Sequence, residues 1–135
     1  MSVIGLDLGT TVCKASLFDE KGNPVLLEHK EYSVVSPHPG WAEQDSIEVW
    51  NTVKDVLKGI VVRAGKYSIP EAICISAQGE AVVFLDRNLK PVRRNILGMD
   101  MRSLSQVEKL KEEFGESWLY ELSGVPAHPI TTSAK

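Results

Sequence analysis

Two β-like segments at the start of the chain, residues 2–8 and 12–18, are separated only by Gly9-Thr10-Thr11. Two such runs joined by a short loop that contains glycine are typical of a β-hairpin. A third β-like segment at residues 25–35 follows a turn at residues 19–24, which contains glycine, asparagine and proline. The pattern therefore predicts three successive antiparallel strands at the start of the fold.

A helix is expected to begin at Asp45 or Ser46 and to stop at Gly65. Asp45, followed three residues later by Glu48, resembles a capping box. Apolar residues then recur at helical spacing, at positions 47, 50, 53, 56, 57, 60, 61 and 64. A buried strand is expected next at residues 71–77, so the chain makes a strand–helix–strand crossover. The fold class is therefore α/β, with a mixed sheet covered by at least one helix.

The rest of the chain has weaker patterns. Two short strands are expected at residues 81–85 and 92–97 around a turn at residues 86–90. A second helix is expected at residues 103–114, with Leu104, Val107, Leu110 and Phe114 on one face. A short helical turn at residues 118–122 should follow.

Length and composition fit a single domain of ordinary size, with 135 residues, 43% of them hydrophobic and 24% charged. The net charge of −3 argues against nucleic acid or an anionic membrane as a partner. The apolar runs are too short to cross a bilayer, and the start does not resemble a signal peptide. Cys13 and Cys74 lack metal-site spacing and are expected to be reduced and buried. We therefore expect a cytoplasmic protein.

The first loop has the composition of a phosphate-binding turn. Gly9 allows an anion to come close, and Thr10 and Thr11 offer hydroxyl and backbone N–H donors. Lys14 would pair with phosphate oxygens, and Asp7 would hold Mg²⁺, most simply through water. The alternative interpretation is an ordinary hairpin with a polar turn.

This loop resembles the start of the sugar kinase, Hsp70 and actin superfamily, whose ribonuclease H-like ATPase fold opens with the same strand–turn–strand. The sequence Asp-x-Gly-Thr-Thr does not separate sugar kinases from chaperones. Residues 39–45 (PGWAEQD), followed by Trp50, resemble the PGWAEQDP–W signature of the FGGY carbohydrate kinases, with Ser46 where proline is usual. Trp41 and Trp50 are expected to act as core or loop anchors.

A second match to these kinases begins at Gln78. Gln78, Gly79 and Glu80 occupy the family's S-x-Q-x-x segment, where a strand ends and its loop faces the sugar. Side chains with several donors or acceptors suit polyol hydroxyl groups. Glycerol kinases have an Arg-Glu pair after the glutamine, of which only the glutamate is matched here, by Glu80. The Met-His pair of xylulose kinases is absent. For Glu80, the alternative is a solvated turn.

Residues 96–102 (ILGMDMR) resemble the family's I-x-W-x-D-x-R stretch, with Gly98 in place of the tryptophan. This replacement would remove an aromatic wall and make room for a larger or differently shaped substrate. The resemblance implies that Asp100 accepts hydrogen bonds from sugar hydroxyls and that Arg102 contacts sugar, orients Asp100 or caps the following helix. The alternative is a simple helix start, with Asp100 in the N-terminal turn.

Residues 123–126 and 131–135 resemble the following T-G-x-P and T-x-x-K-L stretch, so the resemblance covers the whole chain. It implies that residues 1–135 are the N-terminal portion of the first, actin-like lobe of a kinase that uses ATP and Mg²⁺. No catalytic base is matched, because the family's catalytic aspartate and second lobe lie further along. The 135 residues alone are expected to be inactive. Self-association is expected, either of these residues through exposed apolar surface or of the full protein as a homo-oligomer.

Two alternatives to the kinase interpretation remain. One is a stand-alone module that binds sugar or docks to a protein without catalysis. The other is a chaperone-like or actin-like ATPase, which only the first loop suggests.

Overall fold

The computed structural model describes residues 1–65 and 69–135. The chain forms two compact units. Unit 1 comprises residues 1–34 and 45–78, and unit 2 comprises residues 35–44 and 79–135. No helix within the described ranges is long and apolar enough to cross a bilayer.

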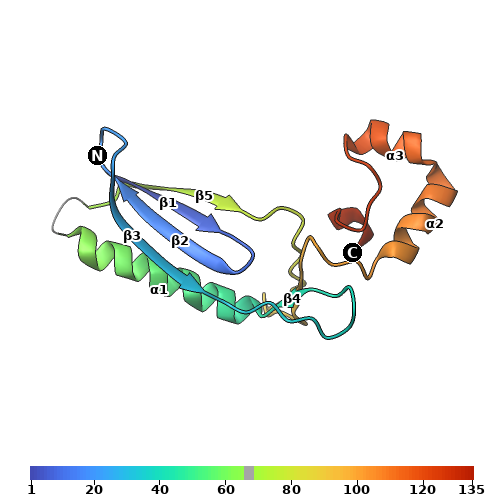
Figure 1. Ribbon diagram of the computed structural model, residues 1–135, viewed down its shortest axis with the longest axis horizontal. Coiled ribbons are helices and arrows are strands. Elements are labelled where there is room, and N and C mark those ends of the chain that lie inside the picture. Colours follow the sequence, from blue (N-terminus) through green and yellow to red (C-terminus); the bar gives the residue numbers. More distant parts are fainter. Residues whose placement is uncertain (66–68) are drawn as a thin grey trace. The chain divides into compact units, whose positions relative to one another are not determined.

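Unit 1 is built on a four-stranded mixed sheet (Figure 1). The strands β1 (Val3–Leu8), β2 (Val12–Phe18) and β3 (Pro24–Glu31) are antiparallel, as the sequence predicts. β5 (Ala72–Ala77) pairs in parallel with β1, which gives the order β3-β2-β1-β5. The expected crossover and mixed α/β sheet are therefore confirmed.

α1 (Ser46–Ala64) begins and ends where the sequence indicates. The Asp45 carboxylate caps it by accepting hydrogen bonds from the backbone N–H groups of Ile47 (2.8 Å) and Glu48 (3.2 Å). Glu48 accepts a bond from the Ser33 N–H (3.3 Å) rather than from Asp45, so the two bonds of a full capping box do not both form. α1 packs on β2 and β3, and these strands share a core with it that includes Leu17, Ile60 and Ala64.

Three exposure predictions for unit 1 are wrong. β5 is exposed along its whole length, because it is an edge strand and α1 covers β2 and β3 instead. Cys13 is buried as expected, but Cys74 lies in β5 and is exposed. Trp50 is 58% exposed and anchors no core, since it lies on the outer side of α1.

Unit 2 contains much less strand than predicted. β4 (Glu43–Gln44) and β6 (Asn95–Ile96) form one short antiparallel pair. Residues 81–85 form only isolated bridges, from Val82 to Ile96 and from Leu85 to Pro91, on either side of the predicted turn. Pro91 has no N–H for a ladder, and the Asp86 carboxylate accepts from the Lys90 N–H (2.9 Å), so pairing stops there.

The helices of unit 2 are α2 (Leu104–Phe114), α3 (Glu116–Ser123) and the short 3₁₀ helix η1 (Thr132–Ala134). α2 lies where it was predicted, but only Val107 of its apolar face is buried. Phe114 is 44% exposed and stacks on Trp118 at 5.4 Å between ring centroids. α3 is a full helix where the sequence suggested only a helical turn.

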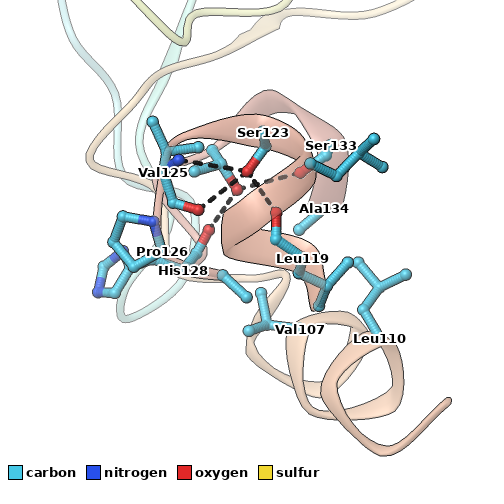
Figure 2. Close-up of a pocket in the computed structure, with 12 residues that line it drawn as sticks. Val107, Leu110, Leu119, Ser123, Val125, Pro126, His128, Ser133 and Ala134 are labelled. Atoms are coloured by element: carbon cyan, nitrogen blue, oxygen red, sulfur yellow. Dashed lines mark hydrogen bonds between the residues drawn. The ribbon is translucent and has the colours of Figure 1, made fainter. Parts of the chain in front are cut away.

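A cavity of about 150 Å³ lies between α2, α3 and the segment that ends in η1 (Figure 2). Its walls are mainly the apolar side chains of Val107, Leu110, Leu119 and Pro126 and their neighbours. The Ser123 hydroxyl on its rim donates to the Leu119 carbonyl (2.7 Å). The cavity is therefore a gap in the packing of unit 2 rather than a polar binding site.

Candidate functional site

The turn after β1 is tight and leaves no room for a side chain at Gly9. The Gly9 N–H donates to the Val12 carbonyl (3.0 Å), and a Cβ atom at Gly9 would lie 3.1 Å from the same oxygen. The Tyr32 hydroxyl donates to the Gly9 carbonyl, and the Tyr32 N–H donates to the Thr11 carbonyl (3.0 Å). Tyr32, which no sequence motif indicated, therefore stabilises this turn through these two hydrogen bonds. Burial raises the pKa of its hydroxyl.

The turn lies beside the residue that follows β5. β1 and β5 are parallel with Leu8 opposite Ala77, so their carboxyl ends meet at one edge of the sheet. The Gln78 N–H donates to the Leu8 carbonyl (3.0 Å), and the Thr10 hydroxyl donates to Gln78 Oε1 (3.3 Å). Two segments that were predicted separately, the phosphate turn and the Gln78 loop, thus meet inside unit 1.

Asp7 and Lys14 lie opposite each other in the β1–β2 ladder, and both are exposed. Asp7 also lines a shallow groove of about 320 Å³ on the sheet, together with Ser16, Phe18 and Ser76. Within residues 1–65 and 69–135, no three His, Cys, Asp or Glu side chains gather to hold a metal ion. A Mg²⁺ ion at Asp7 would therefore need water and phosphate oxygens as its other ligands, which is its usual coordination in phosphate sites.

Glu80 in unit 2 is held by η1. The N–H and hydroxyl groups of Thr132 both donate to Glu80 Oε2, the hydroxyl at 2.5 Å. These bonds, the hydroxyl first, hold the pKa of Glu80 below its ordinary value. The backbone of Glu80 has φ 62°, a left-handed conformation that is uncommon outside glycine.

Lys135 joins three segments of unit 2 through its ammonium group. Its Nζ donates to the carbonyl oxygens of Glu80 (2.7 Å), Ile130 (2.8 Å) and Gly98 (3.4 Å). Burial lowers the pKa of Lys135, against the attraction of the Glu80 carboxylate. A Cβ atom at Gly98 would lie 3.3 Å from the Gly79 carbonyl oxygen, so the space that the missing tryptophan was expected to open is occupied by the chain itself.

Asp100 is only 1% exposed and is surrounded by donors of the protein. Its Oδ1 accepts from the backbone N–H and Nε of Arg102 (both 2.9 Å), and its Oδ2 accepts from the Ala42 N–H (2.6 Å) and from Arg102 (2.8 Å). Burial acts to raise the pKa of Asp100, but these bonds outweigh it and hold the pKa below the ordinary value. Asp100 therefore fixes Arg102 and the loop that contains Ala42.

Arg102 also binds Glu43 and Trp41, which belong to the segment PGWAEQD. Its guanidinium lies 3.7 Å from the centroid of the Trp41 ring and donates to Glu43 Oε1 (2.8 Å). Arg93 donates to the same oxygen (3.1 Å), so the pKa of Glu43, which burial acts to raise, is lowered overall. Trp41 is thus a loop anchor, as predicted, whereas Trp50 is not.

The structure places the predicted site residues in two sets. Unit 1 holds the phosphate-turn residues and the first polyol candidate, namely Asp7, Gly9, Thr10, Thr11, Lys14 and Gln78. Unit 2 holds the other polyol candidates, Gly79, Glu80, Asp100 and Arg102. Sequence reasoning missed the residues that hold them, namely Tyr32, Glu43, Thr132 and Lys135, although the last three lie inside motifs that were matched.

Unit 1, with its antiparallel start, parallel β5 and tight Gly9 turn, has the α/β fold of the actin-like ATPases to which sugar kinases belong. Comparisons with known proteins agree. The model of the FGGY family of carbohydrate kinases, N-terminal domain, matches residues 2–135. The chain therefore belongs to the FGGY family of carbohydrate kinases.

Individual relatives give the same result. Over 134 residues, the chain is 34% identical to a glycerol kinase of Aquifex aeolicus, covering 98% of this chain and 27% of that protein. It is 34% identical over 132 residues to the L-xylulose/3-keto-L-gulonate kinase of Escherichia coli, covering 95% of this chain and 26% of that protein. The crystal structure of Plasmodium falciparum glycerol kinase with ADP matches with a TM-score of 0.89 at 25% identity, over 97% of this chain and 27% of that one. The chain thus spans about a quarter of the length of these relatives.

Proposed function

We propose that this chain is part of an ATP-dependent carbohydrate kinase that transfers the γ-phosphate of ATP to a hydroxyl group of a sugar or polyol. The observation that carries the proposal is the hydrogen bond between Thr10 and Gln78. It joins a turn suited to phosphate with a side chain suited to polyol hydroxyls, at the carboxyl ends of adjacent parallel strands. Ligands of open α/β sheets bind at such an edge.

The phosphate turn fits ATP and Mg²⁺ chemically. Glycine is needed at position 9 for the tight turn, because a Cβ atom there would lie 3.1 Å from the Val12 carbonyl oxygen. The absence of a side chain would also let a phosphate come close to the turn. Thr10 and Thr11 would donate to phosphate oxygens, Lys14 would add positive charge, and Asp7 would hold Mg²⁺ through water. Bound Mg²⁺ would supply charge neutralisation for phosphoryl transfer, while these residues orient the phosphates.

The candidate sugar-binding residues are Gln78 in unit 1 and Gly79, Glu80, Asp100 and Arg102 in unit 2. Gln78 and Glu80 can each accept hydrogen bonds from hydroxyl groups, and Gly79 keeps the loop between them free of a side chain. Arg102 packs on Trp41 and bonds to Asp100 and Glu43, so the group left for a substrate hydroxyl is Nη1, which is buried and has no hydrogen-bond partner among the described residues. Asp100 would contribute by holding Arg102, because each of its carboxylate oxygens already accepts two hydrogen bonds from Arg102 or Ala42.

Residues 1–135 are not expected to catalyse transfer on their own. Kinases of this type need a carboxylate that takes the proton of the attacking hydroxyl. None of Asp19, Asp45, Asp55, Asp86 or Asp100 matches that base by motif, and Asp100 is buried in its own ion pair. The relatives are almost four times longer than the matched segment, which leaves ample chain for a base and an adenosine pocket.

Self-association of the isolated chain is part of the proposal. β5 is an edge strand without charge or proline, and Ile73 (47% exposed) and Ile75 (60% exposed) leave apolar surface beside it. Such an edge readily pairs with another copy. Size-exclusion chromatography with light scattering over a range of concentrations measures this directly.

A cytoplasmic location completes the proposal, as expected for a metabolic kinase.

The test uses the longest natural reading frame that contains these residues. ATP consumption is measured against a panel of pentoses, hexoses and polyols, with Asp7→Ala and Glu80→Ala as variants. Turnover with one sugar that is lost in Asp7→Ala and weakened in Glu80→Ala supports the kinase. Sugar binding without turnover would support the binding module, and sugar-independent ATP hydrolysis would support a chaperone-like ATPase.

A further inference from the structure

Glu80 carries one anchored and one free carboxylate oxygen. Both bonds from Thr132 go to Oε2, whereas no hydrogen bond to Oε1 occurs within the part of the chain that the structure describes. An anchored carboxylate cannot rotate freely, so its second oxygen accepts from one fixed direction. This arrangement suits recognition of a single hydroxyl group better than a freely rotating side chain does.

The backbone that carries Glu80 is held as firmly as its side chain. Lys135 donates to the Glu80 carbonyl (2.7 Å) and to the Ile130 carbonyl (2.8 Å), and so ties the Glu80 loop to the segment before η1. The left-handed conformation of Glu80 is unfavourable for a residue with a side chain and needs such support. Thr132 and Lys135 therefore act on the same residue from two directions.

The turn that carries these two residues is itself anchored. The buried side chains of Thr131 and Ala134 face the cavity between α2 and α3, and the Thr131 hydroxyl donates to the His128 carbonyl (2.7 Å) (Figure 2). The Ser103 hydroxyl, just before α2, donates to the Pro129 carbonyl (3.4 Å). The segment that carries η1 is thus held in place by buried side chains and by these two hydrogen bonds.

We infer that Thr132 and Lys135 are positioning residues for polyol recognition: they fix the Glu80 carboxylate so that Oε1 accepts a hydrogen bond from one substrate hydroxyl. This inference rests on the proposed kinase function and assigns the selectivity of its sugar site. The ligand chemistry is a neutral polyol or ketose that presents a hydroxyl donor to a carboxylate. Neither residue needs to touch the substrate.

The test measures KM for the polyol and for ATP in the longest natural reading frame, for Thr132→Val, Thr132→Ser and Lys135→Met. We expect Thr132→Val and Lys135→Met to raise the polyol KM roughly tenfold with little change in the KM for ATP, the cost of about one hydrogen bond to a charged group. Thr132→Ser keeps the hydroxyl and should restore the wild-type value. Lys109→Met removes an exposed lysine of α2 and is the matched control.

A double-mutant cycle separates positioning from general damage. If Thr132 acts through Glu80, then Thr132→Val has no further effect on the polyol KM in the Glu80→Ala background. Discrimination between the polyol and its deoxy analogues should fall in both single variants. The inference would be overturned if Thr132→Val changed the polyol KM equally with and without Glu80. It would also be overturned if the polyol KM of Lys135→Met equalled that of Lys109→Met.

Failure of the kinase proposal would be visible separately, as absence of turnover with every sugar in the wild type. In that case, the Glu80 carboxyl group is titrated by NMR in the labelled 135-residue chain. Fixed positioning predicts a Glu80 pKa that rises toward the ordinary value in Thr132→Val but not in Lys109→Met. An unchanged Glu80 pKa in Thr132→Val would show that Thr132 does not hold the carboxylate.

Discussion

The backbone of Gly98 lies against Gly79 so closely that a Cβ atom at position 98 would sit 3.3 Å from the Gly79 carbonyl oxygen. The residue before Glu80 and the residue that replaces the family's tryptophan are thus in direct contact. Gly98 therefore supports the Glu80 loop rather than enlarging the sugar pocket.

Gly98→Ala should destabilise unit 2 by about 1 kcal/mol, since the Gly79 carbonyl must move by a few tenths of an ångström. Gly98→Trp should cost more, because a Cβ atom at this position already has Glu80 at 3.7 Å and Ile130 at 3.8 Å, which leaves little room for a ring. Urea denaturation monitored by tryptophan fluorescence measures both effects. Gly79→Ala is the matched control, as a Cβ atom there meets nothing within 4 Å. Equal stability of Gly98→Ala and Gly79→Ala would contradict the close approach.

Arg102→Met should destabilise unit 2 by about 3–5 kcal/mol, because it leaves Asp100 buried without its counter-ion and leaves Glu43 with Arg93 alone. The Arg102 side chain is only 12% exposed, and its guanidinium also packs on Trp41. The free energy of unfolding in urea is the measurement. Arg87→Met, at an exposed arginine in the turn before Pro91, should have no comparable effect. A loss no larger than in Arg87→Met would show that the ion-pair cluster contributes little.

Acid should weaken unit 2 through Asp100 and Glu43. Both pKa values are lowered in the folded chain, so the unfolded chain binds more protons as pH falls below the ordinary values of 3.8 and 4.5. Their contribution to stability is therefore present at neutral pH and is lost as pH falls through the folded pKa values. Urea midpoints from pH 7 to pH 3 should fall less steeply for Asp100→Asn than for the wild type. Parallel curves would mean that Asp100 is not coupled to Arg102.

Gly9→Ala should weaken ATP binding, since the added Cβ atom would lie 3.1 Å from the Val12 carbonyl and open the turn. We expect roughly a tenfold higher KM for ATP in the longest reading frame. Gly65→Ala is the control, because its Cβ atom meets only the Val62 carbonyl at 3.9 Å. An unchanged KM for ATP in Gly9→Ala, with turnover intact, would remove the phosphate role from this turn.

The two cysteines should react at very different rates with a thiol reagent. Cys74 is exposed on β5, whereas Cys13 is buried, and burial raises the pKa of its thiol. The native chain should therefore show one fast thiol, which Cys74→Ser abolishes, and a second only after unfolding. Two fast thiols in the native chain would mean that the core around Cys13 opens readily.

Much of unit 1 could be predicted because its signals are local. The Asp45 cap and the apolar stripe of α1 depend on residues three and four apart, and the tight turn depends on Gly9 and its neighbours. In unit 2, the Asp86 turn is local in the same way. The matches to family motifs also predicted that Gln78 lies where a strand ends and that Glu80 lies in the loop after it. They did not predict which neighbouring residues hold these side chains.

Burial and pairing required the tertiary structure. Whether a strand is covered depends on where the helix packs, and α1 packs on β2 and β3 and leaves β5 exposed. Thr132 donates to Glu80, which is 52 residues away in the sequence, and Arg102 donates to Glu43, which is 59 residues away. Hydrogen bonds over such separations leave no periodic trace in the sequence, because only the folded chain brings their donors and acceptors within reach.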